Sequence, residues 1–189
     1  MCNLASLAAS CGSSSPPGTK EKRYWTPIAE LTGWPATRAA GGGTDQGDTF
    51  ILDEPFDFTG AAVDLGYWRN VSAIVVDTGE LTNNLEGPIG GQGYRQRDTF
   101  FIKGNGPETL EWIDNLLACS GCAVWLVPTK DGNYHVIGNP DNPVYVEVVE
   151  GGSGGDRVGY QITLYANTGK PTYIYDADTH GIDETPNTV

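Results

Sequence analysis

Four cysteines are the first candidates for chemical activity in this chain. Cys119 and Cys122 are separated by two residues, while Cys2 and Cys11 lie near the N-terminus. A Cys-x-x-Cys pair can bind a metal or act as a redox element. A redox pair of the thioredoxin type opens a helix, where the helix dipole lowers the thiol pKa, whereas this pair follows a predicted helix. We therefore predict no metal site, and interpret the cysteines as buried thiols or as a disulfide within each pair.

The glycine-rich run at residues 151–155 does not fit a phosphate-binding loop. Such a loop ends in Gly-Lys followed by Ser or Thr, and a helix follows it. Here the run leads into a strand pattern, and the one Gly-Lys in this region, Gly169-Lys170, is followed by Pro171. We predict no nucleotide or other cofactor, and interpret residues 151–155 as a mobile connection between two antiparallel strands.

No acid, base or nucleophile is placed as catalysis would require. The two histidines are His135, on a predicted strand, and His180, in a polar tail. No Gly-x-Ser-x-Gly motif is present, and residues 176–184 lack the calcium-loop pattern of an EF-hand. Clustered carboxylates are expected in a chain with 24 acidic residues, as at Asp53, Glu54, Asp57 and Asp64. The sequence therefore predicts a protein that is not an enzyme, with no catalytic residue.

Aromatic residues offer a second kind of site. The chain has five Trp and nine Tyr, which could form a carbohydrate-binding platform or pack in a core. Trp112 and Trp125 lie inside predicted elements and are assigned to the core. Trp34 and Trp68 lie in predicted loops, and we consider them candidates for contact with a ligand or a neighbouring subunit.

Charge restricts the partners that the protein can have. The 24 acidic and 11 basic residues give a formal net charge of −13, which argues against binding nucleic acid by neutralising its phosphates. An anionic surface would instead let DNA pass without specific binding. No stretch approaches the roughly 20 apolar residues that span a bilayer, and we expect no membrane partner.

The elements that would position these residues are mostly strands. A content of 26 Gly and 12 Pro is typical of β-rich proteins. Sequence patterns predict strands at 24–30, 70–79, 94–104, 144–150 and 158–166, one or two strands broken at Pro55 within 49–60, and a hairpin of two strands over 123–138. Asp131-Gly132 predicts a two-residue hairpin turn. The strands after residue 122 are expected in meander order.

One helix is predicted at about residues 107–119. Pro107 suits the first helical position, Glu108 complements the helix dipole, and Gly121 can end the helix. Its apolar face is predicted to comprise Leu110, Ile113, Leu116 and Leu117. The fold class is therefore mainly β: an antiparallel β-barrel or β-sandwich with one flanking α-helix and extended terminal arms.

This pattern divides the chain into three parts. Residues 1–20 form a flexible N-terminal arm, residues 21–175 a single β-rich domain, and residues 176–189 a polar C-terminal tail. Within the domain, residues 77–98 are predicted to be a long loop between two antiparallel strands, which together protrude as a hairpin arm.

Two motifs in the C-terminal half carry a family resemblance. A hairpin with the pattern D-G-x-Y-x-x-x-G precedes a strand with the pattern G-D-R-x-G-Y-x-x-T. The chain thereby resembles tail and virion structural proteins of Bacteroidetes phages over about residues 107–173. After that region it departs from the family, because "TYIYDADTHGIDETPNTV" replaces a polar-aromatic stretch. The matching residues are Asp131, Gly132, Tyr134, Gly138, Gly155, Asp156, Arg157, Gly159, Tyr160 and Thr163.

The resemblance implies a tail tube subunit, which forms rings that stack as a hollow tube around DNA in the virion. Its partners would be copies of itself and other virion proteins, assembled in the host cytoplasm. Two alternatives remain: another virion or extracellular filament subunit, such as a head-decoration or head–tail completion protein, and a secreted glycan-binding module that uses Trp34 and Trp68. The expected subunit contacts are Asn83, Asn84, Leu85, Glu86, Ile89, Tyr94, Trp34, Trp68, Asp156 and Arg157.

Overall fold

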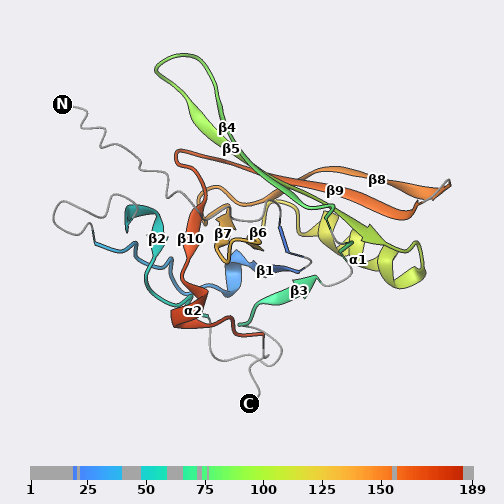
Figure 1. Cartoon of the computed structure of the whole chain (residues 1–189), viewed down its shortest axis with the longest axis horizontal. Helices are drawn as coiled ribbons and strands as arrows, with labels where there is room; N and C mark the ends of the chain where they lie inside the picture. The colour runs from blue at the N-terminus through green and yellow to red at the C-terminus, as the bar shows by residue number, and fades with distance from the viewer. Residues whose placement is uncertain are drawn as a thin grey trace.

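The described residues form two β-sheets stacked face to face, with one helix beside them and a short second helix near the C-terminal end (Figure 1). The computed structural model describes residues 19–20, 22–39, 48–58, 66–71, 74–75, 77–154 and 157–184. The predicted mainly-β class is confirmed as a β-sandwich, and the described residues form no closed barrel. Cys2, Cys11 and most of the predicted N-terminal arm lie outside the described residues.

The first sheet has six strands, and its strands are mostly short. All neighbours are antiparallel except the pair β2 and β10. Two 3₁₀ turns, Ile28–Glu30 and Asp48–Phe50, flank its strands. In sheet order the strands are β2 (Ile51–Leu52), β10 (Tyr173–Tyr175), β7 (Tyr134–Ile137), β6 (Ala123–Pro128), β1 (Arg23–Pro27) and β3 (Arg69–Val71).

The second sheet has four longer strands, all antiparallel. Its longest ladder joins β5 to β9, from Tyr94 opposite Thr168 to Lys103 opposite Gly159. In sheet order the strands are β4 (Glu80–Glu86), β5 (Gly93–Lys103), β9 (Arg157–Thr168) and β8 (Tyr145–Gly154).

The six-stranded sheet buries both of its faces, which explains the uninterrupted apolar stretch of β6. Because side chains of a strand alternate between faces, Trp125 and Val127 join the cluster between the two sheets. Val124 and Leu126 join a second cluster on the opposite face, together with Trp68. That second cluster lies under the loops and under the short helix α2 (Ala177–His180), which Asp176 caps at its N-terminus.

Helix α1 (Pro107–Ala118) lies where the sequence predicted a helix, with Pro107 in its first turn. Ile113 is buried between the sheets, and Trp112 and Leu116 pack against the same cluster. Leu110 and Leu117, however, are 48% and 49% exposed. The predicted apolar face is thus wrong at these two positions, because the side of the helix turned to the sheets runs through Trp112 instead.

Three local predictions are corrected by the strand pairing. Residues 77–98 do protrude as a hairpin, but they are largely its two strands rather than a loop, joined by the turn at residues 87–92. Residues 151–154 belong to β8, so most of the glycine run pairs with β9 rather than forming a mobile connection. The two-residue turn at Asp131-Gly132 is a longer connection, with Thr129 N–H donating to the Asn133 carbonyl at 2.8 Å.

Strands are present on both sides of Asp131-Gly132 and at the predicted 144–150 and 158–166, but their order in space differs from the prediction. β6 and β7 form a hairpin in the six-stranded sheet, whereas β8 and β9 form one in the four-stranded sheet. The chain therefore crosses between the sheets after β7, and the predicted meander is wrong. Residues 70–79 were predicted as one strand, and those of them that the structure describes form the end of β3 and an isolated bridge at Ile74.

One buried ion pair connects the two sheets. Arg23 of β1 donates from Nε to Asp98 Oδ2 of β5 at 2.7 Å and from Nη2 to Oδ1 at 3.1 Å. Both side chains are fully buried. Arg23 also donates to the Lys20 carbonyl and to Thr19 Oγ1, at 2.6 and 2.7 Å. Burial raises the pKa of the Asp98 carboxyl, and the guanidinium of Arg23 opposes that rise.

We expect Asp98→Ala to lower the free energy of unfolding by about 3–5 kcal/mol, because it leaves the Arg23 guanidinium buried without its carboxylate. The matched control is Asp53→Ala, which removes the partner of Arg38 from a pair whose side chains are 42% and 36% exposed. That change should lower the free energy of unfolding far less than Asp98→Ala, because water screens an exposed pair. Urea denaturation followed by far-UV circular dichroism measures both, and equal losses would show that the pair does not hold the sheets together.

Candidate assembly surface

The β4–β5 hairpin projects from one end of the sandwich (Figure 1). Its ladder runs from Glu80 opposite Thr99 to Glu86 opposite Gly93, while the pairing of β5 with β9 ends at Tyr94. Only the turn and the adjacent strand ends therefore extend past β9. We call residues 85–92 the hairpin tip.

The backbone of the hairpin tip depends on glycine. Gly87 and Gly90 have φ angles of +107° and +92°, which L-residues with a side chain rarely adopt. A Cβ atom on Gly87 would lie 2.9 Å from the Gly91 carbonyl oxygen. Gly91 N–H donates to the Pro88 carbonyl at 2.9 Å, which closes the turn. The hairpin tip is thus a hydrogen-bonded turn with a specific backbone conformation.

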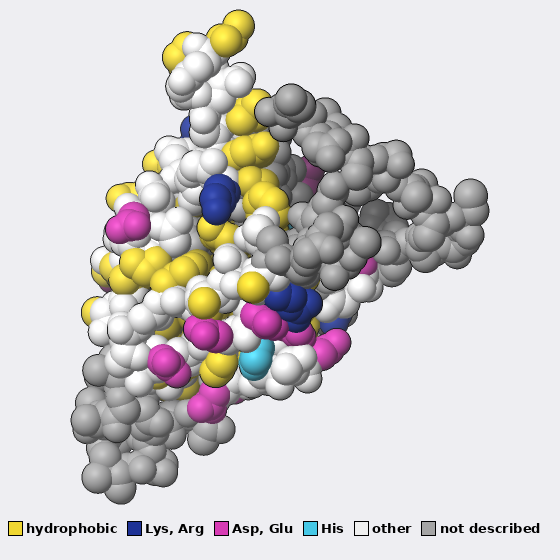
Figure 2. All heavy atoms as spheres, turned by 90° about the vertical axis from the view of Figure 1, so that its left-hand side faces the viewer, with side chains coloured by type: hydrophobic (Ala, Val, Ile, Leu, Met, Phe, Trp, Pro, Cys, Tyr) yellow, Lys and Arg dark blue, Asp and Glu magenta, His cyan; other side chains and the backbone are white. Residues whose placement is uncertain are grey.

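The hairpin tip exposes apolar side chains. Ile89 is 99% exposed and Leu85 is 52% exposed. Figure 2, which looks onto the left-hand side of Figure 1, shows hydrophobic side chains at the top of the molecule, where the hairpin ends. Single exposed apolar residues are common on proteins, but two at the end of a projecting arm gain burial only if another surface meets the arm.

The base of the arm is anchored to the sandwich through Asn83. Its Oδ1 accepts from Thr172 N–H at 3.2 Å, and its Nδ2 donates to Thr172 Oγ1 at 3.3 Å. Buried Gln96 on β5 adds two further links, accepting from Gly138 N–H at 2.9 Å and donating to the Lys170 carbonyl at 3.3 Å. These bonds tie the hairpin to β7 and to the segment before β10.

The outward face of the four-stranded sheet has a compact charge network. Arg95 and Arg97 on β5 both bind the carboxylate of Glu147 on β8, at 2.8–2.9 Å. Arg95 also lies over the Tyr165 ring, 4.4 Å from its centroid, and 3.7 Å from a Glu86 oxygen. Glu147 thus bridges the two arginines across the intervening strand β9, and together with Glu86 it supplies two carboxylates for two guanidinium groups, so this face presents neither arginine as an isolated cation.

The two outer strands of the same sheet, β4 and β8, each have one strand neighbour in the described part of the chain. Near its start, β8 is bonded on its outer side by Ser120, whose Oγ accepts from Val146 N–H at 3.0 Å. The outer strands of a sheet carry backbone groups that can pair with a strand from another chain. Among the described residues, both edges therefore carry backbone groups that a further strand could pair with.

The predicted contact residues fall into different environments. Asn84, Leu85, Glu86 and Ile89 are exposed on the hairpin, and Tyr94 is partly buried at its base. Asp156 lies outside the described residues, and Arg157 is described only by its backbone, which pairs with Gly154 in the β8–β9 hairpin.

The two tryptophans predicted to be available for contacts are not equivalent. Trp68 is 1% exposed and packs edge-on against Phe56, with ring centroids 5.0 Å apart. Its assignment to an accessible loop is wrong, because the loops form a layer that covers the second face of the six-stranded sheet. Trp34 is partly buried and meets Phe56 and Tyr173 edge-on, at 5.5 and 6.4 Å.

The residues considered for chemistry have structural roles. Cys119 and Cys122 form a disulfide at the end of α1. Of the two interpretations offered for this pair, the structure therefore has the disulfide rather than two buried thiols. His135 Nδ1 lies 3.0 Å from Thr172 Oγ1, and burial lowers the pKa of its imidazole while nearby Asp131 opposes that shift.

No group of three or more His, Cys, Asp or Glu in the described ranges could hold a metal ion. None of the described helices is long and apolar enough to cross a bilayer.

Sequence reasoning missed the Arg23–Asp98 pair and the Glu147 network. The alternation of Arg95 and Arg97 along β5 does place both on one face, but nothing in the sequence indicates that β8 lies two strands away. In comparisons with known proteins, no family model matches the chain and no curated protein matches it.

We expect Gly87→Ala to loosen the hairpin tip, because Ala would adopt an unfavourable φ and crowd the Gly91 carbonyl. A strain of about 1–3 kcal/mol should accelerate amide exchange at the strand ends beside the turn by roughly 5- to 150-fold. The control is Gly91→Ala, whose Cβ would meet no atom closer than 3.9 Å. Hydrogen exchange resolved by residue measures both. Equal exchange in the two variants would show that the tip does not depend on the Gly87 conformation.

Proposed function

We propose that this protein is a non-enzymatic structural subunit that assembles with copies of itself, and most specifically a phage tail tube subunit in rings stacked around a DNA-conducting lumen. The observation that carries the proposal is the anchored β4–β5 hairpin, which holds Ile89 almost fully exposed beyond the body of the sandwich. The family resemblance of the C-terminal half points to the same role.

An arm of this kind favours a head-to-tail contact. Burying one side chain of the size of Ile89 gives about 1.5–3 kcal/mol, and that free energy is available only when another molecule covers the tip. The tip lies at the top of the molecule in Figure 1, away from helix α1. A contact between the tip of one subunit and a different surface of the next is heterologous, and such contacts build rings or filaments.

The open edges of the four-stranded sheet support a ring. If β4 of one subunit lies beside β8 of the next, the sheet continues from subunit to subunit and no edge remains unpaired. The two edges lie on opposite sides of the same sheet, as a cyclic arrangement requires. This pairing would use the part of β8 that follows the Ser120 contact.

The charge distribution supports passage of DNA rather than its capture. Protein–DNA affinity comes largely from Lys and Arg that neutralise phosphates. Here Arg95 and Arg97 on the outward face of the four-stranded sheet already donate hydrogen bonds to the Glu147 carboxylate. The chain as a whole has a formal charge of −13. A lumen lined by this face would not hold the phosphate backbone.

Other assembled roles share these features. An extracellular filament subunit, a head-decoration protein or a head–tail completion protein would also use a projecting arm and open edges, and the symmetry of the assembly distinguishes them. A glycan-binding module based on Trp34 and Trp68 is less well supported, because Trp68 is in the core and Trp34 packs against Phe56 and Tyr173. In the proposed role the protein is part of the virion and contacts other virion proteins.

The test is assembly of Ile89→Asp. At high protein concentration the unaltered chain should form hollow tubes with a regular axial repeat, and electron microscopy should show ring-like end views. Ile89→Asp should remain a folded monomer, because its side chain is 99% exposed, and should form no tubes, because a carboxylate is costly to bury in an apolar contact.

The control is Gln92→Asp, which adds the same charge to the same exposed turn without removing an apolar side chain. It should assemble nearly as well as the unaltered chain. Sedimentation velocity and far-UV circular dichroism establish that both variants are folded. Tubes at normal yield from Ile89→Asp, or monomers only from the unaltered chain across salt and pH, would contradict the proposal.

A further inference from the structure

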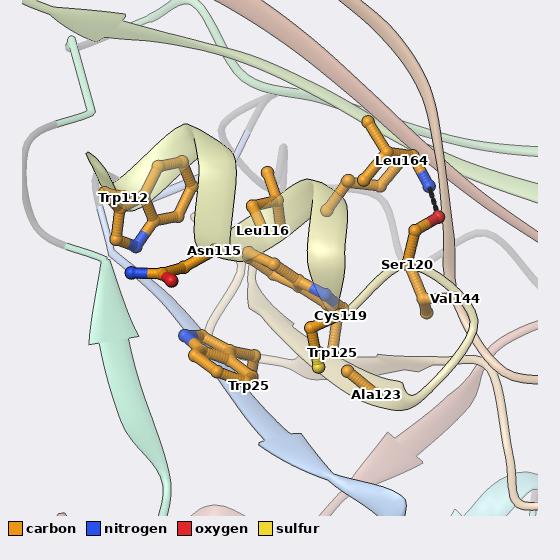
Figure 3. A pocket seen from close by; sticks show the side chains of 11 residues that line it. Trp25, Trp112, Asn115, Leu116, Cys119, Ser120, Ala123, Trp125, Val144 and Leu164 are labelled. Carbon is orange, nitrogen blue, oxygen red and sulfur yellow. Dashed lines mark hydrogen bonds between the residues drawn. The ribbon is translucent and has the colours of Figure 1, made fainter. Parts of the chain in front are cut away.

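A cavity of about 250 Å³ lies between helix α1 and the two sheets (Figure 3). Three of the five tryptophans of the chain line it: Trp25 from β1, Trp112 from α1 and Trp125 from β6. Leu116 of α1 and Leu164 of β9 complete much of the wall. The assembly surface described above does not include any of these residues.

The fold brings the three indole rings together for identifiable reasons. Trp25 and Trp125 are direct partners across the β1–β6 ladder, so their side chains lie on the same face of the six-stranded sheet. Helix α1 crosses that face and carries Trp112 and Leu116, which are four residues apart and hence neighbours on the helix. The disulfide Cys119–Cys122 fixes the end of the helix beside the cavity.

The lining indicates the charge of a ligand. None of the eleven lining residues is charged. Apart from the indole N–H donors of the three tryptophans, the only lining side chains with hydrogen-bonding nitrogen or oxygen are Asn115 and Ser120, and Ser120 already accepts from Val146 N–H. Burying a charge or several unpaired polar groups there would be costly. The cavity therefore suits an uncharged and mostly apolar molecule.

The size and the walls indicate the shape of a ligand. Apolar protein cavities of about 150 Å³ stay dry and bind benzene, so this larger cavity has room for a bicyclic ring system. Aromatic rings favour edge-to-face and offset contacts with other rings, and three indoles offer such contacts from two elements of the sandwich and from the helix. We propose that this cavity binds a small, uncharged, flat aromatic molecule of about bicyclic size.

Entry is possible from the helix side. Asn115 and Ser120 are exposed, and Trp25, Trp112 and Leu116 are only partly buried, whereas Trp125 is 1% exposed at the inner end. A ligand would therefore pass beside α1 and rest against Trp125. This site is independent of the proposed self-assembly, and either can be correct without the other.

The experiment uses indole as the probe with the full chain kept dilute and monomeric. Isothermal titration calorimetry should give saturable 1:1 binding with a Kd on the order of 10⁻⁴ M, as expected for a ligand of this size with good contacts. The indole N–H resonances of the protein should report the location. Those of Trp25, Trp112 and Trp125 should shift on titration, while those of Trp34 and Trp68, which lie in the other cluster, should not.

A pair of neighbouring substitutions tests occupancy of the cavity. Leu116→Trp fills it and should weaken indole binding at least tenfold. Leu117→Trp makes the same change at the next residue, which is 49% exposed and does not line the cavity, and should leave binding unchanged. If Leu116→Trp does not fold, the resonance shifts in the unaltered chain decide.

Three results would overturn the proposal. One is the absence of saturable binding, and another is a shift confined to Trp34 or Trp68. The third is a set of cavity resonances that change with protein concentration alone, which would show that a second copy of the chain fills the site instead.

Discussion

The ion pair between Arg23 and Asp98 is the interaction on which the arrangement of the sandwich depends. It joins residues 75 positions apart and lies between the two sheets, where neither charge reaches water. Such a pair adds little net free energy compared with an apolar contact, but it is very costly to break. Surrounding elements are built around it: a Cβ on Gly79 would lie 2.5 Å from Arg23 Nη2 and still closer to Thr19 Oγ1. The residue just before β4 must therefore lack a side chain, and the close approach of its backbone to Arg23 fixes where β4 and the arm begin.

Strand β5 connects this constraint to the proposed function, because its two faces have different tasks. Its inward residues Asp98, Phe100 and Ile102 hold the sandwich together. Its outward residues Arg95 and Arg97 bind Glu147 and thereby fix β8 across β9. The same strand then continues into the hairpin tip. A projecting arm can be rigid only if its base is continuous with a buried strand, and here the β5–β9 ladder supplies that continuity.

Parts of the fold were predictable because their signals are local. The helix at 107–118 has a proline start and a periodic pattern, and β5 and β9 alternate over many residues. Residues 80–86 were misread as loop because Asn83 and Asn84 are of a type common in turns and glycines flank the segment, although pairing with β5 overrides that preference. Trp68 was misplaced because a sequence cannot show that loops will cover the second face of a sheet. The division of four C-terminal strands between two sheets, and the Arg23–Asp98 and Glu147 contacts, depend on partners distant in sequence.

The residues that hold the monomer together and those proposed for assembly are separate. Arg23, Asp98 and the three cavity tryptophans are buried or partly buried against the core, whereas Ile89 and Leu85 lie beyond it. A side chain that is 99% exposed contributes almost no free energy to folding of the monomer. Folding alone therefore does not require an apolar residue at position 89. An Ile at this position lowers the solubility of an isolated monomer without stabilising it. Its presence at the end of an anchored arm fits the proposed contact with another subunit, in which the side chain would be buried.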